Sequence, residues 1–274
     1  MTFSKHLMLV LLACPFSGLA MKDQSILRDI GVGTLASFAE VAMDQPFVTG
    51  KNMKQQEKPI SLNPKKLWAG GPANALGLAP ITAIQVVGTN QLSQLPLFGR
   101  DSQEANRLAA ASIAGGLSGF VGCASERVTL EQQNKGSSLL VAAKKVGAEG
   151  VRGISKGLAA TMWRDAGFTA GYLGLRPIFK KHFEDVISNS FMLNVASGVA
   201  AGVPAALVTH PFDTAKTIIQ ANPDKQQSML QVLRNTKMRA LYNGGLFRTV
   251  RVANAVTIMG YITEKLSSVS QDKE

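Results

Sequence analysis

For its length, the sequence contains few cysteines, few aromatic residues and few charged residues. Two cysteines in 274 residues exclude a disulfide-built scaffold, and three scattered histidines offer no metal-binding pattern. Charged residues make up 17% of the chain, below the roughly 25% of ordinary soluble domains. Apolar residues make up 46%, which excludes an intrinsically disordered chain. Basic residues outnumber acidic residues, 29 to 18.

Formal charge is absent from three long stretches, residues 67–99, 108–125 and 189–212. A membrane-spanning helix needs about 20 mostly apolar residues, so the last two fit one span each and the first fits a span with a loop. Three further apolar segments contain charges and cover residues 26–47, 158–175 and 246–266. Because intramembrane charges normally face a bundle interior or a watery cavity, six such segments indicate a bundle around a polar path.

The alternative is a soluble protein with long buried helices. The uncharged stretches are rich in Gly, Ala and Ser, and small residues suit close helix packing in lipid. This composition favours the membrane interpretation.

A sequence pattern recurs at an offset of 87 residues. Residues 211–216 (PFDTAK) lie 87 after residues 124–129 (ASERVT), and residues 46–51 (PFVTGK) open the first unit. We therefore divide the chain into an N-terminal extension and three repeats, with the boundaries 1–22, 23–98, 99–186 and 187–274. Three units with two long segments each predict pseudo-threefold symmetry about the membrane normal.

The 211–216 motif resembles the P-x-[DE]-x-x-[KR] signature of the mitochondrial carrier family. The first repeat has Val48 where an acid is expected, and the second has Ala124 for proline and Thr129 for the base. The resemblance implies an all-α membrane protein with six transmembrane helices, in three pseudo-threefold-related pairs around a central cavity. Pro46 and Pro211 are expected to kink their helices, because proline removes a backbone hydrogen bond.

The resemblance further implies a gate of ion pairs on the matrix side, in which the acid of one repeat meets the base of the next. Asp213 would pair with Lys51, and Glu126 with Lys216, while Val48 would face Thr129. In the family, glutamines four residues after each base position hydrogen-bond beneath such pairs. The predicted matrix-gate residues are Lys51, Gln55, Glu126, Gln133, Asp213, Lys216 and Gln220.

The opposite gate is sparse, since the matching positions leave only a Lys180–Glu264 pair. Basic residues gather in the loop inside each repeat, as at Lys65 and Lys66, which puts these loops on one face of the membrane. In the family that face is the matrix side.

Arg164 and Arg251 lie 87 residues apart, and Gly77 lies 87 before Arg164, which defines one level near mid-membrane. The resemblance places substrate contacts at this level, and an Arg followed by an acid is typical of carriers that move amino acids. A guanidinium can bind a carboxylate through two hydrogen bonds, and a neighbouring acid can meet an ammonium. The predicted substrate-binding residues are Gly77, Leu78, Arg164, Asp165, Arg248, Arg251, Glu40 and Asp44.

Glu40 and Asp44 enter this set because they share a helical stripe with Val48 and Lys51. The cavity then carries both signs of charge, which suits a zwitterion. The alternative is that Glu40 or Asp44 only neutralises Arg248 or Arg251.

These residues predict a transporter that exchanges a small charged metabolite, an amino acid or derivative, by alternating access across the mitochondrial inner membrane. An adenine nucleotide or related cofactor is the second candidate substrate. A carrier-like receptor or scaffold that does not transport is the alternative of another class. We expect no enzyme, cofactor, metal or nucleic-acid partner, and a monomer in contact with membrane lipid, including cardiolipin. Residues 1–22 resemble a secretory signal, which leaves another membrane open.

Overall fold

The structure is a computed structural model that describes residues 24–99, 102–222 and 225–271; at the outer ends of the first and last helices only the backbone is described. The predicted N-terminal extension, residues 1–22, lies outside the described residues. Every regular element in the described residues is a helix, which confirms the all-α fold class.

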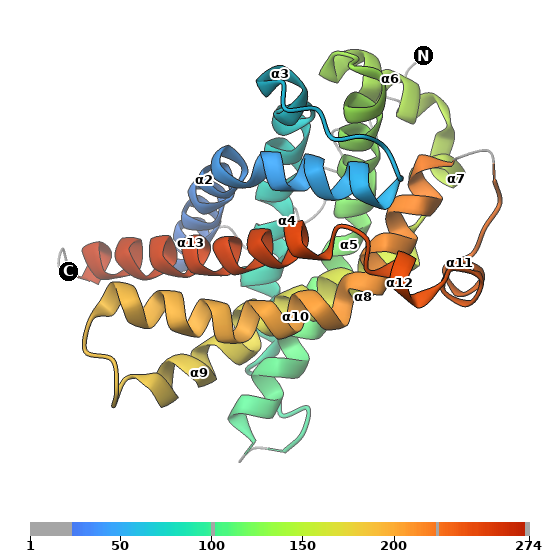
Figure 1. Ribbon diagram of the computed structural model, residues 1–274. Coiled ribbons are helices and arrows are strands. Elements are labelled where there is room, and N and C mark those ends of the chain that lie inside the picture. The colour runs from blue at the N-terminus through green and yellow to red at the C-terminus, as the bar shows by residue number, and fades with distance from the viewer. Residues whose placement is uncertain (1–23, 100–101, 223–224, 272–274) are drawn as a thin grey trace.

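Within each repeat, one or two short helices stand between two long helical stretches (Figure 1). The long elements are α2 (Gln24–Gln55), α4 (Gly71–Leu92), α5 (Gln103–Lys135), α8 (Leu158–Thr169) with its continuations η1 (Ala170–Leu175) and α9 (Arg176–Phe183), α10 (Ser190–Ala221) and α13 (Gly245–Gln271). The short elements between them are α3 (Pro64–Leu67), α6 (Leu139–Ala148), α7 (Gly150–Ile154), α11 (Met229–Asn235) and α12 (Met238–Leu241). Each long helix packs against two others in the order α2, α4, α5, α8, α10, α13, and α13 returns to α2. The long helices therefore close a ring.

Proline lies inside three of the long helices, one of them α4, which contains Pro80. Pro46 lies inside α2, and Pro204 and Pro211 lie inside α10. Figure 1 shows that α2 changes direction along its length. The corresponding helix of the second repeat, α5, contains no proline. A bend is expected where proline lies because its ring clashes with the preceding turn.

A π-helical stretch, η1, forms the end of the fourth predicted segment along the chain, residues 158–175, where the sequence suggested a regular helix. At its end the Arg176 N–H donates to the Gly171 carbonyl, five residues back. Pro177 follows and has no N–H to donate. A wide turn of this kind changes the direction in which the side chains after it point.

In each of the three repeats, a glycine with left-handed backbone geometry immediately precedes the second long helix, which is α4, α8 or α13. Their φ angles are 82°, 82° and 78° at Gly70, Gly157 and Gly244, which lie 87 residues apart. A Cβ added at any of them would meet the signature's sixth position in the next repeat along the ring. These contacts pair Gly70 with Thr129, Gly157 with Lys216 and Gly244 with Lys51. Glycine is needed here both for the backbone angle and for the close approach.

Two helices in the described part of the chain are long and apolar enough to cross a membrane, α5 and α10. Helix α2 carries Glu40 and Asp44, and α13 carries Arg248 and Arg251, which lowers their mean hydropathy. Length and apolarity alone therefore support two of the six predicted spans.

Candidate functional site

Two ion pairs join α10 to α2 and α5 across the ring, the first of them buried and the second partly buried. The Lys51 Nζ atom on α2 lies 2.8 Å from the Asp213 Oδ2 atom on α10. The Lys216 Nζ atom on α10 lies 3.1 Å from the Glu126 Oε2 atom on α5. The structure thus brings together both pairs of residues that the signature pairs.

The third side of the ring, between α2 and α5, is held by neutral hydrogen bonds. The Asn52 amide donates to Gln133 Oε1 at 2.7 Å, and the Gln133 amide donates to Thr49 Oγ1 at 3.1 Å. This is the side on which Val48 and Thr129 stand in the signature positions, so no ion pair can form there. No sequence pattern singled out Asn52, because it lies outside the signature.

The three predicted glutamines make three different sets of contacts. The Gln55 amide donates to Asp213 Oδ2 at 2.8 Å, directly beneath the Lys51–Asp213 pair. Gln133 supports the neutral side of the ring described above. The Gln220 amide donates to the Lys156 carbonyl at 3.3 Å instead of to the Lys216–Glu126 pair. The predicted arrangement beneath an ion pair is therefore seen at Gln55 and not at Gln220.

Asp213 is the most heavily contacted acid of the site. Its side chain is 1% exposed, and the Arg248 Nη1 atom lies 2.9 Å from its Oδ1 atom. The Arg164 Nη1 atom lies 3.5 Å from the same oxygen. Together with Lys51, three cations from three helices converge on one carboxylate.

Arg164 connects the predicted substrate level to both gate acids. Its guanidinium forms an ion pair with Glu126 on α5 and lies 2.5 Å from Asp165 on its own helix. With the 3.5 Å approach to Asp213, Arg164 contacts three acids. Neither the 87-residue offset nor the signature predicted contacts between Arg164 and the gate acids.

Arg251, the equivalent residue on α13, pairs with an acid of α2. Its Nη2 atom lies 2.7 Å from Glu40 Oε1. Asp44, one turn further along α2, accepts a hydrogen bond of 3.2 Å from the Asn254 amide. The Glu40–Arg251 contact is the one that the neutralisation alternative describes.

A small polar cavity of about 60 Å³ lies among these groups. Its charged lining residues are Glu40, Lys51, Glu126, Arg164, Asp165, Lys216, Arg248 and Arg251, and Leu78 also lines it. Ligand pockets usually measure about 300–1,000 Å³, so in this state the cavity is too small for a metabolite. The side chains that a substrate would contact are now contacting each other.

Gly77 and Asp44 do not line this cavity. A Cβ added at Gly77 would lie 2.3 Å from the Ser125 Cβ, so Gly77 is at the crossing of α4 and α5. The 87-residue offset predicted the level of Gly77. In the structure, Gly77 lies on a different side of α4 from the cavity.

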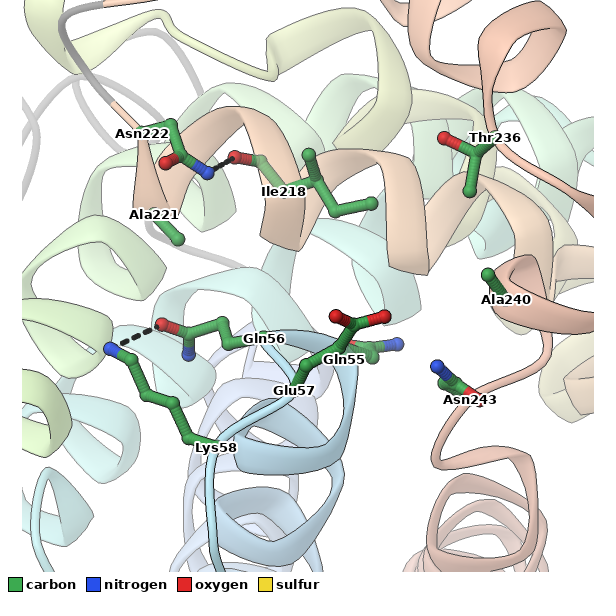
Figure 2. A pocket seen from close by; sticks show the side chains of 10 residues that line it. All are labelled: Gln55, Gln56, Glu57, Lys58, Ile218, Ala221, Asn222, Thr236, Ala240 and Asn243. Carbon is green, nitrogen blue, oxygen red and sulfur yellow. Dashed lines mark hydrogen bonds between the residues drawn. The ribbon is translucent and has the colours of Figure 1, made fainter.

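A larger pocket of about 280 Å³ lies between the ends of α2 and α10 (Figure 2). Figure 2 shows Gln56 and Lys58 on one side, with the Lys58 Nζ atom 3.0 Å from Gln56 Oε1. Gln55 is the only predicted site residue in its lining. The charged side chains gather in the smaller cavity, which is therefore the candidate site.

Arg127, next to the gate acid, forms a further link that the sequence did not reveal. Its guanidinium pairs with Glu149 and donates to the Gln220 carbonyl at 2.8 Å. It therefore ties α5 to the end of α10. The side chain of Glu264 lies outside the described residues, so the Lys180–Glu264 pair stays a prediction. Among the described side chains, no cluster of three His, Cys, Asp or Glu residues is placed to hold a metal ion.

Comparison with known proteins places these observations in one family. A model described as mitochondrial carrier protein matches residues 101–186 and 188–274. A Xenopus tropicalis protein named mitochondrial glycine transporter is 36% identical over 129 residues, which cover 43% of this chain and 43% of that protein. A Pyricularia oryzae protein of the same name is 27% identical over 250 residues, 73% of this chain and 75% of that protein. A human mitochondrial glutathione transporter is 28% identical over 220 residues, 71% of this chain and 64% of that protein. The match to the frog protein thus spans less than half of its length.

Proposed function

The chain belongs to the mitochondrial carrier family, and from this premise we propose that it is a membrane transporter of the mitochondrial inner membrane. It would exchange a small charged metabolite, an amino acid or amino-acid derivative, by alternating access. Its six long helical stretches would each span the membrane, as three pseudo-threefold-related pairs around the central cavity. The monomeric state, the lipid contacts including cardiolipin, and the Lys180–Glu264 gate remain predictions from the resemblance.

The distribution of polar and apolar side chains supports membrane insertion. Leu35 and Phe38 on α2 are 59% and 47% exposed, and Leu117 on α5 is 51% exposed. Glu40 and Asp213 are 1% and 0% exposed. Apolar side chains therefore face outward while charges face the interior, the reverse of the arrangement in water and the one that lipid favours.

The cyclic contacts support three equivalent repeats. The Lys51–Asp213 pair, the Lys216–Glu126 pair and the Asn52–Gln133 bond each join two different repeats. The three left-handed glycines lie against residues of the same cycle, Gly70 against Thr129, Gly157 against Gln220 and Lys216, and Gly244 against Lys51. With these contacts made, the gate on the side of the short helices is closed.

The observation that carries the proposal is the position of Arg164, paired with Glu126 and 3.5 Å from Asp213. A substrate carboxylate that binds the Arg164 guanidinium competes with both gate acids for it. Binding would therefore weaken the contacts that hold the matrix gate closed. A ligand can shift two states only through its different affinity for them, and this competition supplies such a difference.

The charges of the cavity favour a substrate that carries both signs. Arg164 and Arg251 offer guanidinium groups to a carboxylate, and Asp165 and Glu40 offer carboxylates to an ammonium. The relatives named glycine and glutathione transporters are consistent with this class. Five bases against three acids in the lining keep an adenine nucleotide as the second candidate.

The test is exchange by the purified protein in liposomes loaded with glycine, other amino acids, glutathione or adenine nucleotides. Arg164→Ala and Arg251→Ala each remove charge-assisted hydrogen bonds worth about 1.5–3 kcal/mol, so we expect exchange to fall about tenfold to a hundredfold. Lys144→Ala is the matched control, because Lys144 is an exposed base on α6. If both arginine variants exchange as fast as Lys144→Ala, the site assignment is wrong. If the folded wild-type protein exchanges none of these solutes, the receptor or scaffold alternative replaces transport.

A further inference from the structure

Asp44 on α2 is a buried acid that the proposed transport mechanism does not use. It is 1% exposed and does not line the cavity. Its Oδ1 atom accepts a hydrogen bond of 3.2 Å from the neutral Asn254 amide on α13. Its Oδ2 atom has no hydrogen-bond partner among the described residues.

The charges around Asp44 are not balanced. Glu40 lies one turn earlier on α2, and both acids face Arg251 on α13. Arg251 forms its ion pair with Glu40, at 2.7 Å. One guanidinium therefore serves two carboxyl groups at this helix contact.

The other helices packed against α2 supply no further base to Asp44. Helix α4 contains no charged residue, and the two bases of the short helix α3, Lys65 and Lys66, are exposed. Arg248 of α13 is paired with Asp213, and Lys216 of α10 is paired with Glu126. His210 of α10 contacts the Asn243 carbonyl, and Lys51 on α2 itself is paired with Asp213. No base among the described residues forms an ion pair with Asp44.

An ionised carboxylate out of water and without a partner costs several kcal/mol, and a group in this position takes up a proton instead. Two carboxyl groups that share one counter-ion behave in the same way, because only one of them is neutralised by the cation. Glu40 forms the ion pair with Arg251, so Asp44 is the acid that is left without a counter-ion.

We propose that Asp44 is a proton-binding site and that its Oδ2 atom holds one proton in the described state. The hydrogen bond from Asn254 to Oδ1 fits this assignment, because Oδ1 is then the carbonyl oxygen of a neutral acid. The proton comes from water as α2 closes against α13 and Asp44 loses its hydration, and it returns to water when the helices separate and Asp44 is hydrated again. Closing α2 against α13 therefore takes up one proton per molecule.

Infrared spectroscopy of the full-length protein in lipid tests directly for this proton. A protonated carboxylic acid gives a carbonyl-stretching band that a carboxylate lacks. We expect this band at neutral pH and expect it to shift when the protein contains carbon-isotope-labelled aspartate. A wild-type protein without the band, or with a band that the label does not shift, would overturn the proposal.

Three variants identify the residue. Asp44→Asn should lose the band. Glu40→Gln should lose it as well, because Arg251 is then left with Asp44 as its acid and Asp44 ionises. Asp165→Asn is the matched control and should keep the band, because the acid it removes is already paired with Arg164.

A band that persists in Asp44→Asn or in Glu40→Gln contradicts the assignment. Helical content from circular dichroism confirms that each variant is folded, and Glu40→Gln decides the question if Asp44→Asn does not fold. The measurement requires no transport, so its outcome is independent of the exchange experiments above.

Discussion

Replacing Asp213 with asparagine should destabilise the protein more than replacement of any single base that contacts it. The carboxylate is fully buried and receives Lys51 at 2.8 Å, Arg248 at 2.9 Å and the Gln55 amide at 2.8 Å. Asparagine keeps the shape of the side chain but leaves these cations buried without their acid. Breaking a buried pair from one side costs about 3–5 kcal/mol.

Thermal unfolding of the purified protein in detergent measures this loss. At about 2–4 °C per kcal/mol for a chain of this size, Asp213→Asn should lower the melting temperature by roughly 6–20 °C. Lys51→Met should cost less, about 1–3 kcal/mol, because Asp213 keeps Arg248 as a partner. The double variant should show a coupling energy of about 0.5–3 kcal/mol.

The matched control is Asp185→Asn, which removes an exposed acid at the end of α9 and should change stability by less than about 0.5 kcal/mol. If Asp213→Asn and Asp185→Asn have the same melting temperature, the Asp213 carboxylate is not the electrostatic centre of the site. Strict additivity of Lys51→Met and Asp213→Asn would likewise refute the contact between them.

Two further predictions test features that the signature does not contain. Gly77→Ala should lower the melting temperature, because its Cβ would lie 2.3 Å from the Ser125 Cβ, and Ser125→Gly should restore it in the double variant; failure of this rescue would show that Gly77 acts elsewhere than at the α4–α5 crossing. Asn52→Ala and Gln133→Ala should each cost about 0.5–1.5 kcal/mol in thermal unfolding, the net worth of a neutral hydrogen bond, and their effects should not add. Independent effects of the two changes would argue against a neutral link on this side of the ring.

The sequence predicted which residues lie together at the signature positions. A three-residue spacing places Asp213 and Lys216 on one face of α10, and proline at Pro211 marks where the helix bends towards its neighbours. When three such units close a ring, the acid of one unit lies at the same depth as the base of the next. The family resemblance implied the pairing of Lys51 and Lys216 with acids of neighbouring units, and the repetition agrees with it.

The sequence could not predict contacts that depend on rotation about a helix axis. The 87-residue offset fixes the level of Gly77 and Arg164 along the membrane normal, but it does not say which side of the helix faces the cavity. Gly77 turns to α5, and the long side chain of Arg164 reaches Glu126 and Asp213 from a different helix. The π-helical stretch in the same segment is also invisible in the pattern of apolar residues.

Val48 and Thr129 show how a ring of three contacts accommodates the loss of one ion pair. Losing a single charge would leave its partner buried and unpaired, whereas losing both leaves neutral positions that hydrogen bonds can join. Asn52 and Gln133 supply that bond, and Gln133 extends it to Thr49. This side therefore contributes less to closing the gate than either ion pair.

In the proposed mechanism, the contacts of Arg164 connect substrate binding to gate opening. With one neutral side, the closed ring depends mainly on two ion pairs, and their acids, Glu126 and Asp213, are both contacted by Arg164. A ligand that takes the guanidinium acts on both remaining pairs at once. Lys51 and Arg248 still hold Asp213 after Arg164 leaves, while Glu126 keeps Lys216 alone. The α5–α10 side, where Glu126 meets Lys216, should therefore be the first of the two ion-paired sides to separate when a substrate carboxylate binds.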